Sequence, residues 1–355
     1  MRDPAQHAGP HLAHLAIVGT GAALPARRVG PADFVAAGAD PALLAEWDVG
    51  EHRVAESESA TDLEARAALQ CIERAGWSPE DVDLMIGCTL LPEKVNPSNI
   101  ALTQHKIGAR RAAAIGVDMA CIGPVPALMM ADALFRTGQF SRIVVVASSQ
   151  LAGAMDDTDP AVFAVCGDGA AAVALGPVDQ PAGVIATHLT ARGEYWNNVG
   201  IEPRGPRYPR SGGPCDIRPR FYIDHSRGGD VKEFFSWCMA SVPDAVGELL
   251  RKVSLTIADV DWVCPHQNVK TVSEVWIDRI GVPRDRVIET RKEYGNVGPA
   301  NVLLNLDRGA TGGAFGHGDK ILLFGQGSGM SVGTLLLRWH GRGSTPPRAP
   351  LADQP

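Results

Sequence analysis

Residues 117–130 read Val117-Asp118-Met119-Ala120-Cys121-Ile122-Gly123-Pro124-Val125-Pro126-Ala127-Leu128-Met129-Met130, and the rest of the chain is organised around them. A β-branched run ends in small residues, a cysteine follows, and an apolar segment continues at helical spacing. This pattern predicts a strand, a sharp turn and a buried helix that begins at Cys121. Unpaired N–H groups and the helix dipole favour negative charge there, so we expect the thiol to be tuned toward thiolate. The alternative is a buried structural cysteine.

The composition excludes several classes of protein. A length of 355 residues predicts two domains or one large duplicated domain. The net charge of −7 argues against a nucleic-acid partner, and no apolar run is long enough to span a membrane. The seven cysteines are scattered without a C-x-x-C pair, which fits free thiols better than disulfides or a metal site. The N-terminus lacks the apolar core of a signal peptide, and we therefore expect a cytoplasmic protein.

Apolar runs and helix signals predict strands alternating with helices. We expect strands at 14–21, 81–88, 143–147 and 262–264, and helices at 61–76, 99–107 and 242–253. Thr61 with Glu64 three residues later suggests the N-cap of the first helix. Residues 204–229 combine prolines, glycines and six arginines, which predicts a long surface loop, either a solvated insertion or a cap that receives anionic groups. The tail at 343–355 is expected to be disordered.

The second half of the chain repeats landmarks of the first at near-constant offsets. The segment that starts Cys121-Ile122-Gly123-Pro124 is echoed by Asn296-Val297-Gly298-Pro299, and Gly167-Asp168-Gly169 by Gly327-Ser328-Gly329. This indicates a duplicated α/β fold with pseudo-equivalent halves at 14–180 and 181–342.

The duplication brings three functional groups toward one place. Cys121 and Asn296 begin equivalent helices, which can meet near the pseudo-two-fold axis. His266 follows the strand 262–264, at the carboxyl end where sites of α/β proteins collect. A thiol that attacks a thioester, with an imidazole and an amide that donate to the developing oxyanion, is an arrangement suited to acyl transfer.

These motifs resemble those of the β-ketoacyl-acyl carrier protein synthase III family. The resemblance runs from about Leu15 to Trp339 and rests on Gly19-Thr20-Gly21, Ala120-Cys121, Gly167-Asp168-Gly169-Ala170, Pro265-His266-Gln267, Gly295-Asn296 and Phe324-Gly325-Gln326-Gly327. It implies the thiolase fold, a five-layered αβαβα homodimer, with Cys121 as acyl acceptor and His266 and Asn296 acting on the extender. It also implies an oxyanion hole from the backbone N–H groups of Cys121 and Gln326, and substrate contacts at Trp47, Asn96 and Asn268.

The chain departs from the family pattern at five places. The segment from Glu46 to Arg53 is shorter than usual, Pro160 replaces an arginine that commonly stacks on the coenzyme A adenine, and Asn96 replaces a phenylalanine that crosses the dimer. His266-Gln267-Asn268 lacks the usual alanine before asparagine, and Gln326 stands where glycine is usual. These departures favour a relative in secondary metabolism over an acetyl-coenzyme A-primed enzyme of fatty-acid synthesis.

Three hypotheses follow. The first is a condensing enzyme that joins an acyl group on Cys121 to a malonyl or β-ketoacyl thioester in polyketide or related biosynthesis. The second is an acyltransferase of the same fold that delivers the acyl group to an oxygen or nitrogen nucleophile. The third is a non-catalytic interaction protein. Asn296 favours the first, since an amide suits enolate stabilisation, whereas a carboxylate would orient the imidazole as a base. We expect no metal and no cofactor, with substrates carried on the phosphopantetheine of acyl carrier protein or coenzyme A.

Overall fold

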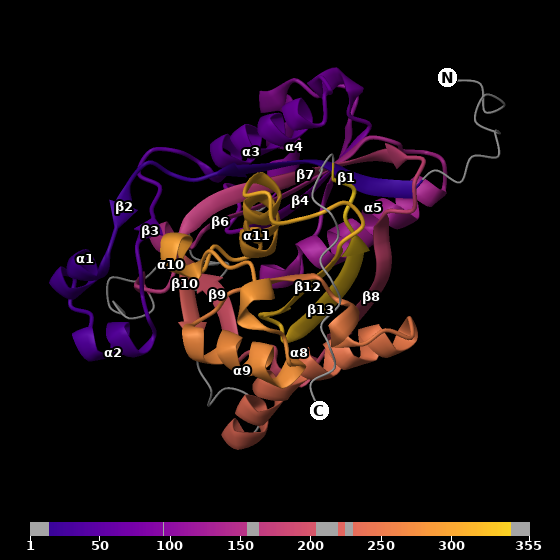
Figure 1. Cartoon of the computed structure of the whole chain (residues 1–355). Coiled ribbons are helices and arrows are strands. Elements are labelled where there is room, and N and C mark those ends of the chain that lie inside the picture. The colour runs from indigo at the N-terminus through magenta and orange to yellow at the C-terminus, as the bar shows by residue number, and fades with distance from the viewer. Residues whose placement is uncertain (1–13, 95, 155–162, 204–218, 224–229, 342–355) are drawn as a thin grey trace.

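The computed structural model describes residues 14–94, 96–154, 163–203, 219–223 and 230–341 (Figure 1). The helices are α1 Pro31–Ala36, α2 Pro41–Glu46, α3 Ala60–Arg74, α4 Asn99–Ile107, α5 Pro124–Arg136, α6 Leu151–Ala154, α8 Val231–Lys252, α9 Lys270–Ile280, α10 Arg291–Tyr294 and α11 Ala300–Thr311. The strands are β1 His14–Ala23, β2 Arg28–Val29, β3 His52–Arg53, β4 Leu84–Leu90, β5 Ala113–Gly116, β6 Ile143–Gln150, β7 Asp168–Val178, β8 Gly183–Ala191, β9 Val199–Pro203, β10 Pro219–Ile223, β11 Trp262–Pro265, β12 Lys320–Gly327 and β13 Ser331–Arg338.

Two mixed sheets repeat one strand order. In the first sheet the order is β1-β7-β6-β4-β5, with β1 and β6 antiparallel to β7 and with β4 parallel to both β6 and β5. In the second the order is β8-β13-β12-β11, with the same sequence of antiparallel and parallel pairings. The counterpart of β5 is reduced to one parallel bridge between Val263 and Val287. The predicted boundary at 180 and 181 lies between β7 and β8.

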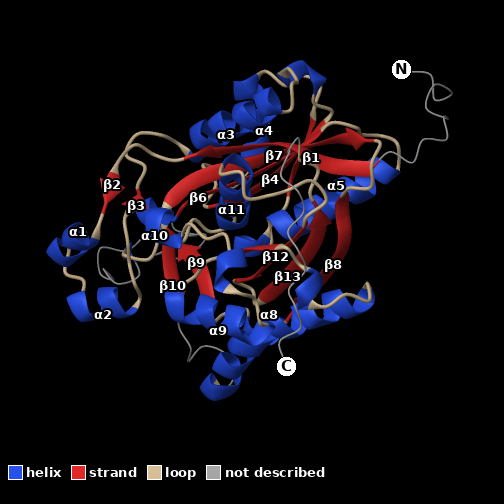
Figure 2. Ribbon diagram, viewed as in Figure 1, coloured by secondary structure: helices blue, strands red, loops and turns tan. Residues whose placement is uncertain are grey.

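Helices cover and separate the two sheets (Figure 2). Helices α3 and α4 pack on the outer face of the first sheet, and α8 and α9 on the outer face of the second. Helices α5 and α11 lie between the sheets, where their apolar residues join both inner faces in one cluster. The expected five-layered αβαβα architecture is therefore confirmed.

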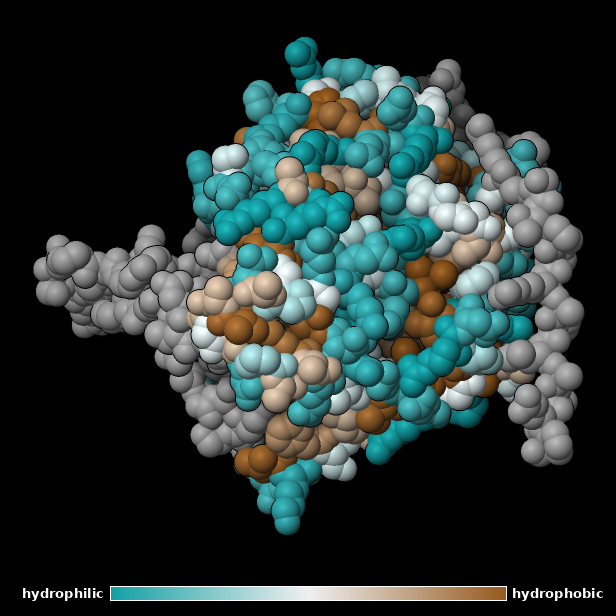
Figure 3. Space-filling view, turned by 60° about the vertical axis from the view of Figure 1, so that its left-hand side comes forward, coloured by the Kyte–Doolittle hydropathy of each residue, from teal (hydrophilic) through white to brown (hydrophobic). Residues whose placement is uncertain are grey.

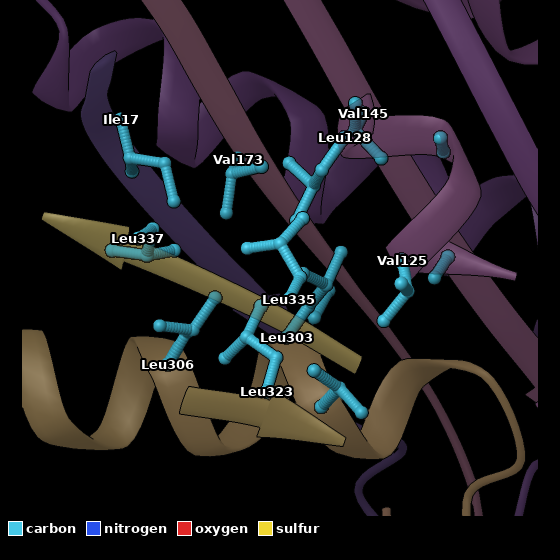
Figure 4. Close-up of a cluster of buried hydrophobic side chains, with 14 of the residues drawn as sticks. Ile17, Val125, Leu128, Val145, Val173, Leu303, Leu306, Leu323, Leu335 and Leu337 are labelled. Atoms are coloured by element: carbon cyan, nitrogen blue, oxygen red, sulfur yellow. The ribbon is translucent and has the colours of Figure 1, made fainter. Parts of the chain in front are cut away.

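The middle layer contains the principal core (Figure 4). Leu128 of α5 and Leu303 of α11 are almost completely buried and lie between side chains from both sheets, such as Val145 of β6 and Leu335 of β13. Burial of these aliphatic side chains drives the assembly of the halves, at roughly 1.5–3 kcal/mol for each large one. It also fixes α5 and α11 relative to each other.

The N-terminus of α3 differs from the sequence prediction. Ser59, not Thr61, is the N-cap, because its hydroxyl accepts from the Asp62 N–H and the Asp62 carboxylate accepts from the Ser59 N–H. Glu64 is buried instead of capping. It accepts hydrogen bonds from three hydroxyls of β4, α4 and β6, those of Thr89, Thr103 and Ser148.

Two further predictions need correction, and others fall outside the described residues. The strand before Cys121 ends at Gly116, so residues 117–119 are not part of it. Residues 219–223 form β10, which pairs antiparallel with β9, although the loop prediction covered them. Pro160, residues 204–218 and 224–229, and the tail 343–355 lie outside the described residues.

The described surface is mixed in character (Figure 3). On the face shown, hydrophilic residues surround several separate hydrophobic patches. No described helix is both long enough and apolar enough to cross a membrane. Within the described ranges, no group of three or more His, Cys, Asp or Glu side chains is arranged to hold a metal ion.

Candidate active site

Cys121 lies on a sharp turn between β5 and α5. After β5, the Val117 N–H still donates to β4, to the Gly87 carbonyl at 2.8 Å. The Asp118 carboxylate accepts from the Ala120 N–H at 3.0 Å, and Ala120 takes a positive φ of 45°. Cys121 then sits in a short 3-10 helix, Ala120–Ile122, immediately before α5. The predicted buried helix is confirmed, but Cys121 precedes it instead of opening it.

The electrostatics of Cys121 contradict the expectation of a thiolate. Burial raises its pKa most strongly, and the charge of Asp118 raises it further, so that the pKa reaches about 12. Hydrogen bonds from the backbone N–H groups of Cys121 and Ser328 lower the pKa but do not compensate. The dipole effect is confined to the first turn of a helix, whereas desolvation acts on the whole thiol. Cys121 is therefore a protonated thiol at neutral pH.

Asn296 enters the site from the turn before α11. Asn296 forms an isolated parallel bridge with Cys166, in which the Asn296 N–H donates to the Val165 carbonyl at 2.8 Å. The Gly298 N–H donates to Asn296 Oδ1 at 2.9 Å, which leaves Nδ2 as the end of the amide that can donate to a substrate. Buried Asn301 braces this turn by accepting from the Val297 N–H at 2.9 Å.

His266 follows β11, as predicted, and is completely buried. Its Nε2 lies 2.9 Å from Oδ1 of Asn268. Burial lowers its pKa to about 4, although the contacts with Asn268 and the Gly298 backbone act in the opposite direction. The imidazole is thus neutral at physiological pH. Gly325 makes room for it, since a Cβ there would lie 2.3 Å from the His266 Cβ.

A cavity of about 450 Å³ joins Cys121 and Asn296. Its polar lining includes Cys121, Asn268, Asn296, Gln326 and Ser328. The remaining wall is mostly apolar. Much of it comes from β9, α8 and α9, through the side chains of Val199, Ile201, Phe234, Phe235, Met239 and Val272. None of the described lining residues is charged. His266 does not line the cavity itself, because Asn268 lies against its Nε2.

Trp47 lines the same cavity from the N-terminal lobe, which we define as residues 28–54. Arg291 of α10 donates to the Trp47 carbonyl at 3.1 Å and to the Asp48 carbonyl at 2.9 Å. His52 of β3 lies within 3.0 Å of the Cys166 carbonyl through Nδ1, and its ring packs against Gly295. The lobe is thus joined to the segment that leads into Asn296 and to Cys166, the bridge partner of Asn296.

The structure brings five of the predicted site residues together at the cavity. Cys121, Asn296, Asn268, Gln326 and Trp47 meet at the cavity, and His266 stands directly behind it. Asn96 is exposed and does not line the cavity of the single chain, so its substrate role stays a prediction. The same holds for the Gln326 N–H in the oxyanion hole.

Sequence reasoning missed the N–H of Ser328 and the ring of His52. Ser328 was visible only as part of the Gly327-Ser328-Gly329 echo. Asp168 of the equivalent Gly167-Asp168-Gly169 motif has a structural role, since its carboxylate accepts from the N–H groups of Ala55 and Ala152, each at 2.8 Å. Burial raises the pKa of Asp168 to about 6.

Two family models match parts of this chain. Residues 115–193 match the family model described as 3-Oxoacyl-[acyl-carrier-protein (ACP)] synthase III, and residues 250–339 match its C-terminal model. The chain is 31% identical over 325 residues to a β-ketoacyl-[acyl-carrier-protein] synthase III of Sphingopyxis alaskensis, covering 90% of this chain and 97% of the relative.

Solved structures give the same result. The priming β-ketosynthase of the R1128 polyketide biosynthetic pathway has a TM-score of 0.84 at 26% identity, covering 94% of this chain and 99% of that one. The 3-oxoacyl-[acyl-carrier-protein] synthase III of Aquifex aeolicus has a TM-score of 0.82 at 26% identity, covering 92% of this chain and 100% of that one.

The thiolase fold and the thiol-containing cavity define the class, an enzyme of the acyl-transferring condensing type. Within that class, the chain belongs to the β-ketoacyl-acyl carrier protein synthase III family.

The raised pKa of Cys121 makes a testable prediction. Below a pKa of about 12 the thiolate fraction rises tenfold per pH unit, and the thiolate is the nucleophile. We expect the rate of Cys121 alkylation by iodoacetamide to increase about tenfold per unit from pH 7 to pH 9.5. The measurement is the mass of the alkylated Cys121 peptide against time, with Cys121→Ser as the blank. A plateau below pH 9 would contradict the assignment.

Proposed function

We propose that the protein is a ketosynthase III-like enzyme that loads an acyl group on Cys121 and then forms a carbon–carbon bond with a malonyl thioester. The observation that supports this most is the meeting of Cys121 and the Asn296 amide in one largely apolar cavity, with His266 behind Asn268. A β-ketoacyl thioester is the alternative extender.

In the loading step, Cys121 Sγ attacks the carbonyl carbon of an acyl thioester. A new carbon–sulfur bond forms, the bond to the carrier sulfur breaks, and the thiol proton passes to the departing carrier thiolate. Developing negative charge on the carbonyl oxygen needs backbone donors close to Sγ. The N–H groups of Cys121 and Ser328 reach the thiol, and the Gln326 N–H is the further donor that the family resemblance implies.

In the second step, a malonyl thioester loses carbon dioxide and leaves an electron pair as an enolate. The enolate carbon attacks the acyl carbonyl, the bond to Sγ breaks, and the Cys121 thiolate takes a proton from water. Loss of carbon dioxide requires no base, which fits a described lining without carboxylates and an imidazole whose pKa is about 4. Asn296 Nδ2 and His266 Nε2 would donate to the enolate oxygen once the substrate takes the place of Asn268.

The competing function is transfer of the Cys121 acyl group to an oxygen or nitrogen nucleophile. That reaction needs a group that removes a proton from the nucleophile, and catalytic bases work best with a pKa near the operating pH. Because burial lowers the pKa of His266 to about 4, the site is better suited to decarboxylative condensation. The chemistry draws on the chain and its thioester substrates, so we propose that it uses no cofactor.

The two steps can be separated by substitution. Incubation with an acyl thioester should give one adduct by intact mass, and Cys121→Ala should abolish it. His266→Ala should still load, since the backbone N–H groups remain, but condensation with malonyl thioester should fall by roughly 10² or more, the scale for loss of an oxyanion donor.

His105→Ala, an exposed histidine of α4, is the matched control and should keep both steps. An adduct on Cys121→Ala, or condensation by His266→Ala at the wild-type rate, would refute the assigned roles.

We further propose that the enzyme acts in polyketide or related secondary metabolism and takes its acyl group from an acyl carrier protein. The apolar walls of the cavity fit an acyl group larger than acetyl. Pro160 removes a stacking arginine, a loss of about 0.5–2 kcal/mol of cation–π attraction for coenzyme A. Six arginines in 204–227 could meet an acidic carrier, although most of this segment lies outside the described residues.

Loading rates test this assignment. Each buried methylene contributes about 0.8 kcal/mol, so kcat/KM for loading should rise roughly fourfold per methylene until the cavity is filled. We expect medium-chain acyl groups on carrier protein to load faster than the same chains on coenzyme A, and both faster than acetyl-coenzyme A. The formation of the Cys121 adduct over time measures each rate. Fastest loading from acetyl-coenzyme A would place the protein in fatty-acid synthesis.

The open edge of the first sheet supports a homodimer. Strand β5 lies at the end of this sheet, and its residues Ala113, Ala114 and Gly116 are exposed. An exposed apolar edge strand is a template for pairing with another chain. We propose that two copies pair through β5, in the cytoplasm, where the described cysteines would stay free thiols.

Sedimentation tests the dimer directly. The wild-type protein at micromolar concentration should have twice the mass of one chain, and Ala114→Lys should sediment as a monomer because its charge opposes edge pairing. Ala36→Lys, on exposed α1, serves as the control and should stay dimeric. A monomeric wild-type protein would rule out this interface.

A further inference from the structure

Gln326 is a polar side chain in the cavity that the proposed reaction does not use. It lies on β12, is 7% exposed, and lines the cavity together with Cys121. On the side away from the cavity, its Nε2 donates to the hydroxyl of Ser241 on α8 at 3.1 Å, and the amide N–H also donates to the sulfur of Cys238. Helix α8 therefore holds the Gln326 amide in a defined orientation.

This orientation decides which atom meets a substrate. The NH₂ end is directed to α8, and the opposite end of the amide is the acceptor Oε1. No described residue donates a hydrogen bond to Oε1, and this atom is not among the fully buried polar atoms that lack partners. Oε1 is therefore accessible, and the accessible space beside Gln326 is the cavity.

Oε1 of Gln326 is an acceptor among neighbouring groups that are either donors or apolar. Asn296 presents Nδ2, because its Oδ1 accepts from the Gly298 N–H, and the Cys121 thiol is met by backbone N–H donors. Phe234, Cys238 and Met330 contribute weakly polar or apolar wall beside Gln326. Binding of a molecule that displaces water from such a carbonyl oxygen without supplying a donor costs free energy.

We propose that Gln326 is a specificity-determining residue, whose Oε1 accepts a hydrogen bond from an N–H or O–H group of the thioester substrate close to its reacting carbonyl. The inference rests on the proposed loading of Cys121 and names a feature of the substrate that this site selects. Two parts of a substrate can supply the donor. One is the amide N–H of the carrier arm, two carbons from the sulfur, and the other is a hydroxyl group on the acyl chain.

The test is a cycle of substrates and variants, with kcat/KM for adduct formation on Cys121 as the readout. The first pair of substrates is an acyl N-acetylcysteamine thioester and its analogue in which CH₂ replaces the amide N–H. The second pair is a hydroxyacyl and an acyl thioester of equal length. Wild-type enzyme should favour the donor-bearing member of one pair by roughly 3- to 10-fold, the scale of one neutral hydrogen bond.

Gln326→Met, which keeps length but removes the acceptor, should bring that ratio to about 1. Ser241→Ala leaves the Gln326 acceptor in the cavity but releases its anchor, and should give an intermediate ratio. Gln139→Met, on an exposed residue after α5, should keep the wild-type ratio. The pair whose ratio collapses identifies the donor as the carrier arm or the acyl chain.

Equal ratios in wild-type enzyme and Gln326→Met for both pairs would overturn the inference while leaving the proposed function intact. Absence of any Cys121 adduct in wild-type enzyme would instead refute the proposed function. If Gln326→Met does not fold, Ser241→Ala decides, since an unchanged ratio there also contradicts a held acceptor.

Discussion

The burial of two helices between two sheets is the constraint on which the site depends. Helices α5 and α11 exclude water from both inner sheet faces and can do so only side by side. Because they occupy equivalent places in the two halves, the turns that precede them meet at one end of the middle layer. That is why Cys121 and Asn296, far apart in the sequence, line one cavity. The proximity of Cys121 and Asn296 is thus a consequence of apolar packing.

Sequence patterns were sufficient for the architecture and for the proximity of Cys121 and Asn296. The helix at 99–107 was predicted at its observed bounds, and the echo of Cys121 by Asn296 implied equivalent helices. These features depend on local periodicity and on the internal repeat, and both can be recognised in the sequence.

The remaining features depend on what surrounds each residue in three dimensions. The dipole argument for Cys121 had the correct sign, but the sequence could not reveal the desolvation that outweighs it. Nor could it show that Asn268 separates His266 from the cavity, since the contact depends on the path of the backbone after β11. The cap of α3 is Ser59, paired with Asp62, and Glu64 instead accepts from three hydroxyls of neighbouring elements, which no local pattern shows.

The attachment of the N-terminal lobe has a consequence for how such enzymes diverge. His52 contacts the Cys166 carbonyl and packs on Gly295, while Arg291 holds the backbone at Trp47 and Asp48. The lobe, the wall of the cavity and the turn carrying Asn296 therefore form one mechanical unit. Residues 28–54 therefore cannot be exchanged independently of the rest of the chain. A lobe grafted from a relative with a longer segment there would make different contacts, and any mismatch would displace the Asn296 amide. A change in the lobe that moves the Trp47 wall of the cavity would therefore also reach the turn that carries Asn296.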